Sequence, residues 1–144
     1  MPTVSVTKRI AAPAEKVWRM VSAWGNTHEW IPGVGPVTVD GSGVGATRSA
    51  ELDPATGFPG RITESLDAFE EDAHSFRYSI VGQSPIPIEN YVAEMQVHKV
   101  DGQSCDVTWQ STWDPNGDLS AEQLIEAFEG LYDISLENVR AACE

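Results

Sequence analysis

Residues 120–143 have the sequence SAEQLIEAFEGLYDISLENVRAAC and predict one long amphipathic helix at the end of the chain. Ser120 and Gln123 have the spacing of a capping box, in which each side chain accepts a hydrogen bond from the other residue's backbone N–H. Apolar residues then recur every three or four positions and share one side of the helix. Two overlapping faces contain Leu124, Phe128, Leu131 and Ser135, and Ile125, Phe128, Tyr132, Leu136, Val139 and Cys143. A stripe this wide is suited to packing against a sheet.

The preceding residues predict a strand, two short helices and a run of further strands. Residues 4–10 alternate between apolar and polar, as in a half-buried strand. Pro13 suits the first position of a short helix that ends before Gly25, and residues 26–30 predict a second short helix. Alternating patterns predict six more strands, at residues 37–39, 45–52, 61–66, 75–82, 91–100 and 105–113.

This order of elements predicts the fold class. No linker or internal repeat interrupts it, so the sequence predicts a single domain over residues 1–144. Segregated strands and helices are typical of α+β proteins, with helices on one face of an antiparallel sheet. We expect a curved antiparallel sheet of about seven strands around the long C-terminal helix, with a pocket between them, where ligand sites are commonly found.

Charge and composition exclude several classes of function. Nine Lys plus Arg stand against 22 Asp plus Glu, a formal net charge of -13 that would repel nucleic acid. No apolar run approaches the ~20 residues of a membrane helix, so membrane insertion is not expected. Residues 1–10 lack the apolar centre of a signal peptide, and Cys105 and Cys143 are expected to be free thiols. We therefore expect a cytoplasmic protein.

Five short stretches carry a family resemblance. They are Ile10–Trp18 (IAAPAEKVW), Gly45–Arg48 (GATR), Ile62–Asp67 (ITESLD), Tyr78–Ile80 (YSI) and Asn90-Tyr91 (NY). In their order and spacing the chain resembles the polyketide cyclase/dehydrase branch of the START-like superfamily, also called SRPBCC, which includes the birch-pollen allergen. The resemblance covers nearly the whole chain and implies a helix-grip fold, in which a curved sheet wraps the C-terminal helix around a cavity for a small ligand.

Within that superfamily the chain also resembles the plant abscisic acid receptors in part. The TGFPG segment, residues 56–60, is similar to their gate loop. This likeness implies a lid over the cavity mouth formed by Gly57, Phe58, Pro59 and Gly60. The pocket lysine and the histidine-arginine latch of those receptors have uncharged counterparts in this chain, at Pro32 or Gly33 and at Ile86-Pro87. A receptor for an acidic hormone is therefore disfavoured, whereas a gated pocket is not.

The alternation of the strands indicates which side chains face the cavity. Glu64, Tyr78 and Tyr91 have apolar companions two positions away, so they are expected to point inward. Arg48 shares its face with Ala50 and is expected inward too. Candidate catalytic groups are Glu64, Arg48 and Tyr91. The predicted ligand-binding residues are Arg48, Glu64, Tyr78, Ile80, Asn90, Tyr91, Met95, Gln110, Phe128, Tyr132 and Leu136.

Glu64 is the most informative candidate, because a lone carboxylate in an apolar cavity must neutralise or find a partner. If Leu52 pairs near Ile62, then Arg48 lies diagonally from Glu64 on the neighbouring strand. Two interpretations remain open. The pair is either an internal ion pair that fixes sheet curvature, or a polar anchor or acid/base that faces a ligand. Arg48 would favour the ionised carboxylate, which weakens the case for Glu64 as a base.

The last predicted strand has two incompatible readings. Apolar spacing places Val107, Trp109 and Trp113 inside, whereas a two-residue turn at Asp101-Gly102 would turn Gln110 inward. A β-bulge would reverse the latter assignment. The family resemblance favours Gln110, which is the residue expected to line the cavity.

Three functions from different classes fit this sequence. The leading hypothesis is binding of a small hydrophobic molecule, such as a polyketide, lipid-like or aromatic metabolite. The alternatives are a polyketide cyclase/dehydratase-like enzyme that uses the same cavity and a protein-interaction module of the co-chaperone kind. No metal or other cofactor is expected. Asp114, Asn116 and Asp118 are spaced like the start of a calcium loop, but the glycine and the glutamate that such a loop requires are absent. The expected oligomeric state is a monomer or homodimer.

Overall fold

The computed structural model describes all 144 residues and has the expected order of elements. Strands and helices follow one another as β1 (Thr3–Ile10), α1 (Ala14–Val21), the 3-10 helix η1 (Thr27–Glu29), β2 (Thr38–Asp40), β3 (Thr47–Leu52), the 3-10 helix η2 (Pro54–Thr56), β4 (Gly60–Glu70), β5 (Ser75–Ile80), β6 (Ile88–Asp101), β7 (Ser104–Pro115) and α2 (Ala121–Cys143). No helix is long and apolar enough to cross a bilayer.

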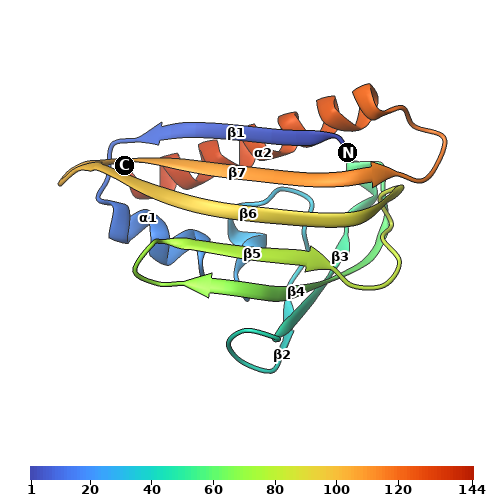
Figure 1. Ribbon diagram of the computed structural model, residues 1–144, viewed down its shortest axis with the longest axis horizontal. Helices are drawn as coiled ribbons and strands as arrows, with labels where there is room; N and C mark the ends of the chain where they lie inside the picture. The colour runs from blue at the N-terminus through green and yellow to red at the C-terminus, as the bar shows by residue number, and fades with distance from the viewer.

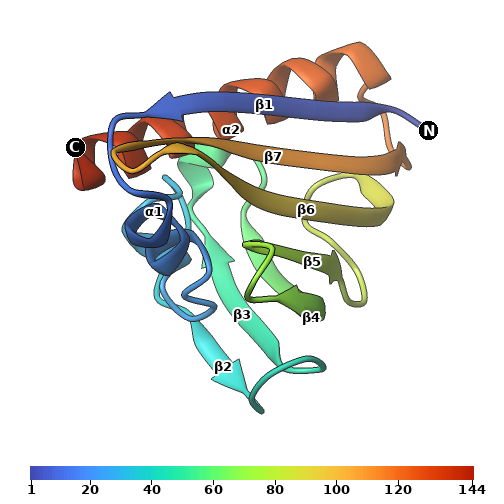
Figure 2. The ribbon, with the colours of Figure 1, turned by 60° about the vertical axis from the view of Figure 1, so that its left-hand side comes forward.

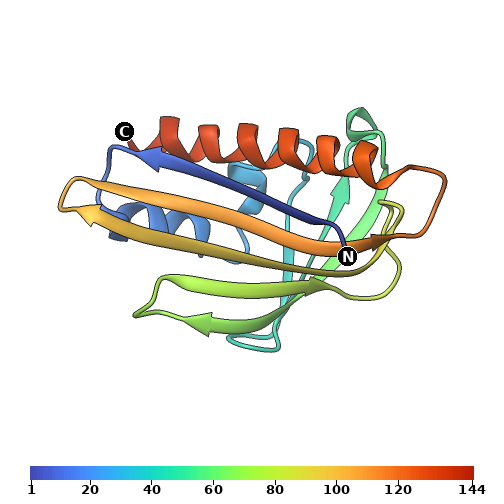
Figure 3. The same ribbon diagram turned by 45° about the horizontal axis from the view of Figure 1, so that its top comes forward.

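All seven strands form one antiparallel sheet in the order β1-β7-β6-β5-β4-β3-β2. Helix α2 lies along β1 and β7, as Figures 1 and 3 show. The sheet bends strongly, so that β3 and β2 run at a steep angle to β1 and β7 (Figure 2). The predicted α+β helix-grip fold is therefore confirmed.

Helix α2 starts with the chemistry that its sequence predicts. The Ser120 side chain accepts a hydrogen bond from the backbone N–H of Gln123 at 3.1 Å, and the Gln123 side chain accepts one from the N–H of Ser120 at 2.9 Å. These bonds satisfy two donors that helix geometry leaves unpaired. The buried face of α2 consists of Leu124, Phe128, Tyr132, Ser135, Leu136, Val139 and Cys143.

A β-bulge near the β6–β7 turn decides which face of β7 is buried. Lys99 pairs with Cys105 but Asp101 pairs with Ser104, so Val100 is an extra residue in β6. Such an insertion reverses the alternation of the strand beyond it. Directly opposed residues share a face in an antiparallel pair, and the shifted register therefore gives β7 an inward face that contains Val107, Trp109, Ser111 and Trp113. Gln110 is exposed on the outer face and bonds Glu94, so its predicted inward position is wrong.

A second bulge in β6 places the side chain of Asn90 outside the cavity, so its predicted inward position is wrong. Glu89 pairs with Asp114 and Val92 with Thr112, which leaves one extra residue in β6. Asn90 has a φ of 57°, and its amide donates a 3.1 Å hydrogen bond to Asp114 at the exposed surface. Asn90 therefore does not face the cavity, because the bulge turns its side chain outward while Tyr91 turns inward.

Candidate ligand cavity

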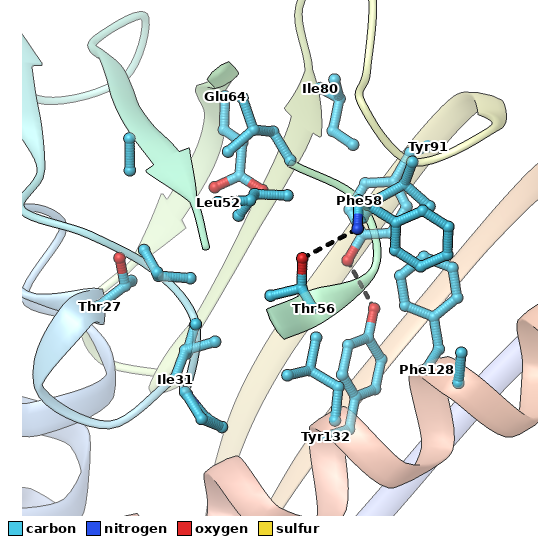
Figure 4. Close-up of a pocket in the computed structure, with 18 of the residues that line it drawn as sticks. Thr27, Ile31, Leu52, Thr56, Phe58, Glu64, Ile80, Tyr91, Phe128 and Tyr132 are labelled. Atoms are coloured by element: carbon cyan, nitrogen blue, oxygen red, sulfur yellow. Dashed lines mark hydrogen bonds between the residues drawn. The ribbon is translucent and has the colours of Figure 1, made fainter. Parts of the chain in front are cut away.

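A cavity of about 380 Å³ lies between the bent sheet and the N-terminal half of α2. Of its 25 lining residues, 18 are hydrophobic, and the lining comes from η1, β3 to β7, α2 and the loops around residues 31–37, 55–58 and 86. Figure 4 shows side chains from these elements pointing toward one another across the hollow. A hollow with this lining can hold a small molecule that is mostly apolar.

Most of the predicted ligand-binding residues line this cavity. They are Arg48, Glu64, Tyr78, Ile80, Tyr91, Phe128 and Tyr132. The inward orientation that the alternating pattern predicts for Glu64, Tyr78 and Tyr91 is therefore confirmed. That these side chains bind a ligand stays a prediction.

Met95 and Leu136 point inward but do not line the cavity. Both are almost fully buried in the hydrophobic core. The C-terminal half of α2 packs against α1, with Cys143 Sγ 3.9 Å from Met20 Sδ. This packing fills the interior at that end, so the hollow remains only beside the first turns of α2. Periodicity predicts an inward face but not where along the face the packing ends.

The predicted gate loop borders the cavity through one of its four residues, Phe58. The Thr56 hydroxyl donates to the carbonyl of Asp53 at 2.7 Å and accepts from the N–H of Phe58 at 3.1 Å, a bond drawn in Figure 4. Gly57 and Gly60 have positive φ angles of 84° and 144°, conformations that glycine adopts without strain. Gly57, Pro59 and Gly60 do not themselves line the hollow.

Arg48 and Glu64 form an ion pair in the cavity wall. They are directly opposed in the β3–β4 register, because Leu52 pairs with Gly60, whereas a pairing near Ile62 would have placed them diagonally. Arg48 Nε donates to Glu64 Oε1 at 2.8 Å, and Oε2 makes no hydrogen bond within the protein. The carboxylate of Glu64 projects toward the hollow in Figure 4. The pair thus neutralises a buried arginine and still offers one carboxylate oxygen to a ligand.

Trp24 completes the environment of Arg48 and has no signal in the sequence that identifies it. Its ring centroid lies 3.7 Å from the guanidinium carbon of Arg48, and its carbonyl accepts a 3.2 Å bond from Nη1. The guanidinium is also 5.0 Å from the centroid of the Tyr78 ring. An arginine only 5% exposed therefore has an anionic, a carbonyl and two aromatic partners.

Three tyrosines, one tryptophan and one serine form a continuous hydrogen-bond chain beside the cavity. Trp109 Nε1 donates to the Tyr78 hydroxyl at 3.1 Å, and the Tyr78 and Tyr91 hydroxyls are 3.2 Å apart. The Tyr91 and Tyr132 hydroxyls are 2.5 Å apart, and Tyr132 donates to Ser111 Oγ at 2.8 Å. Trp109 and Ser111 are on the inward face of β7 that the register bulge creates, and the sequence alone did not connect them to the tyrosines.

Burial keeps these phenols protonated. It raises the pKa of Tyr78 and of Tyr91 well above the usual value, and it also raises the pKa of Tyr132. The negative charge of Glu64 raises all three pKa values further. At neutral pH the three phenols of this hydrogen-bond chain are therefore uncharged. No group of three or more His, Cys, Asp or Glu side chains could hold a metal ion.

A bent sheet, one gripped helix and an apolar cavity between them define a helix-grip domain of the SRPBCC type. The chain belongs to the family described as polyketide cyclase / dehydrase and lipid transport, which it matches over residues 1–144.

Solved structures from bacteria share this fold. XoxI from Bacillus cereus has a TM-score of 0.87 and 24% identity, over 99% of this chain and 96% of XoxI. A protein from Thermobifida fusca has a TM-score of 0.82 and 27% identity, over 97% of this chain and 91% of its own. The Zhui aromatase/cyclase from Streptomyces sp. R1128 has a TM-score of 0.79 and 18% identity, over 99% and 93% of the two chains.

Proposed function

We propose that this protein binds a small, largely apolar molecule reversibly in the cavity between α2 and the sheet. The observation that carries this proposal is the hollow of about 380 Å³ with 18 hydrophobic residues among its 25 lining residues. Ligand pockets in proteins usually span roughly 300–1,000 Å³ and combine an apolar wall with a few polar groups. The cavity has the dimensions of such a site, and its polar groups are concentrated at Arg48, Glu64 and the tyrosines.

The lining favours a compound with rings over a long acyl chain. Phe58, Tyr91, Trp109, Phe128 and Tyr132 all border the hollow. Aromatic side chains stack on planar ligands or contact them edge-on, and their faces also attract polarised C–H groups. An aromatic or cyclised polyketide-like metabolite therefore matches both the size and the surface of the cavity.

Two measurements test binding. Native mass spectrometry of freshly purified protein should detect a retained small molecule. The neutral fluorescent compound N-phenyl-1-naphthylamine should bind and be displaced by that molecule. Ala127→Trp should weaken binding severalfold, because Ala127 borders the cavity from an exposed position at its rim and an indole there can cover the hollow. Ala142→Trp is the matched control, as it places the same side chain at an exposed position of the same helix outside the cavity. Wild-type protein that retains nothing and binds no apolar compound would contradict the proposal.

A second candidate is proton-transfer catalysis on the bound molecule. Glu64 Oε2 is free of protein partners and faces the hollow, where it could take a proton from a carbon next to a ligand carbonyl. The family description, which includes cyclases and dehydrases, supports this candidate. Conversion of the retained molecule by the wild type and not by Glu64→Gln, measured with both proteins saturated with that molecule, is the expected result. Binding without turnover in the wild type would leave only the first function.

A further inference from the structure

The hydrogen bonds of the tyrosine chain run in one direction. An indole N–H can only donate, so Tyr78 accepts from Trp109. At the other end the single hydrogen of Tyr132 is donated to Ser111. Tyr132 therefore accepts from Tyr91, and Tyr91, whose hydrogen is then used, accepts from Tyr78. The order of donation is Trp109 to Tyr78 to Tyr91 to Tyr132 to Ser111.

This direction leaves the three phenols with acceptor capacity only. Each phenol hydrogen is committed to the next oxygen, while each phenol oxygen still has room to accept another bond. Glu64 Oε2, also in the cavity wall, is a further acceptor. The donors that border the hollow lie elsewhere, at Arg48, Thr27, Ser49 and Thr56, and the Thr56 hydroxyl already donates to the Asp53 carbonyl. A ligand group that reaches the phenols thus meets oxygen lone pairs and no available hydrogen.

Building on the binding function above, we propose that the phenol wall is a subsite for a neutral O–H or N–H donor of the ligand. The preferred ligands are hydroxylated apolar compounds, such as phenols and alcohols, over their ethers. An ether oxygen at this wall would oppose other acceptors and leave them unpaired, which a buried site strongly disfavours. Ionised ligands are also disfavoured, because Glu64 already neutralises Arg48 and the phenols are buried.

Ser111 sets this polarity without lining the cavity, so we treat it as a positioning residue. Its Oγ is the terminal acceptor of the chain. Without that oxygen one phenol O–H has no acceptor, whichever way the remaining bonds run, because Trp109 still donates into Tyr78. The unpaired O–H would turn to the cavity and become a donor. Ser111→Ala should therefore change which ligands are preferred, an effect that simple loss of packing would not produce.

The test compares naphthalene, 2-naphthol and 2-methoxynaphthalene by calorimetric titration at neutral pH. The wild type should bind 2-naphthol about five- to tenfold more tightly than the methyl ether, the fold-change of one hydrogen bond. Ser111→Ala should reduce this ratio to near one or invert it. Ser135→Ala is the matched control, since Ser135 is equally buried on α2 but donates to the Leu131 carbonyl outside the chain. It should keep the wild-type ratio.

Equal affinities of the two compounds in the wild type, or a preference that persists in Ser111→Ala, would overturn this inference. Naphthalene binding in the same experiment would show that the proposed binding function still stands. If the wild type bound none of the three compounds, both proposals would fail. Should Ser111→Ala not fold, Tyr132→Phe provides the same test, because it removes the acceptor of Tyr91 and frees that hydrogen.

Discussion

Arg48 and Glu64 face each other directly across the β3–β4 pair, and Nε of the arginine lies 2.8 Å from Oε1 of the glutamate. The arginine is 5% exposed and borders the cavity. The pair therefore contributes both to the stability of the sheet and to the polar character of the cavity wall. Removing either partner leaves the other charge without a counter-charge in an apolar wall.

The first prediction separates the pair from its individual charges. Arg48→Met should lower the free energy of unfolding by about 3 kcal/mol, because it leaves Glu64 without its counter-charge. The double variant Arg48→Met/Glu64→Met should recover most of that loss, since two apolar side chains replace the pair. Urea unfolding of the wild type, both single variants and the double variant measures the coupling. A double variant as unstable as the less stable single variant would refute this account.

The second prediction concerns Gly33, a residue of the loop before β2 that packs against Thr56 at the start of the gate loop. Gly33 has a φ of 83°, and a Cβ there would overlap Cγ2 of Thr56. Since Thr56 holds the backbone of Phe58, Gly33→Ala should displace Phe58 and weaken N-phenyl-1-naphthylamine binding severalfold. Gly43→Ala is the control, because Gly43 also has a positive φ, of 68°, with no atom within 4 Å of the added Cβ. It should cost about 1 kcal/mol of stability and leave affinity unchanged.

The third prediction tests the bulge at Asn90. Asn90→Gly should preserve both stability and ligand affinity, because glycine adopts the positive φ of 57° readily and the side chain lies outside the cavity. Asn90→Val should destabilise the protein by about 1–2 kcal/mol, since a β-branched residue resists this conformation. Thermal unfolding and titration of the same apolar probe give the two readouts. Loss of affinity in Asn90→Gly at unchanged stability would place the side chain in the binding site after all.

The fourth prediction is a loss of stability at alkaline pH. Burial raises the pKa of Cys105 from 9.0 to about 11, and it raises the pKa of Tyr78 in the same direction. Above pH 9 the unfolded chain releases these protons while the folded chain retains them, so the free energy of unfolding should fall as the pH rises toward 11. Cys105→Ala should make the decline shallower. Urea unfolding at several pH values tests this, and a stability that is flat over the range would contradict it.

The sequence by itself determined the elements and their order. The capping box at Ser120 and the spacing of Leu124, Phe128 and Tyr132 specify α2, because both signals lie within a few residues of the structure they describe. Alternation likewise specifies the seven strands and turns Glu64, Tyr78 and Tyr91 inward. Local periodicity suffices here, since each pattern is set by the geometry of one strand or one helix.

Only the tertiary structure decided what faces the cavity where that periodicity is broken. The bulge at Val100 reverses which face of β7 points inward, so Gln110 lies outside the cavity and Trp109 is buried. The bulge at Asn90 turns that side chain outward from β6. The packing of α1 against the end of α2 confines the hollow and keeps Leu136 out of its wall. Both effects arise from how separate segments pair and pack. The apolar spacing of residues 107–113 agrees with the buried face of β7, but it did not exclude the opposite face that a two-residue turn predicts. The hydrogen-bond chain to Ser111 also arises from the packing of separate segments, since its members come from three strands and one helix.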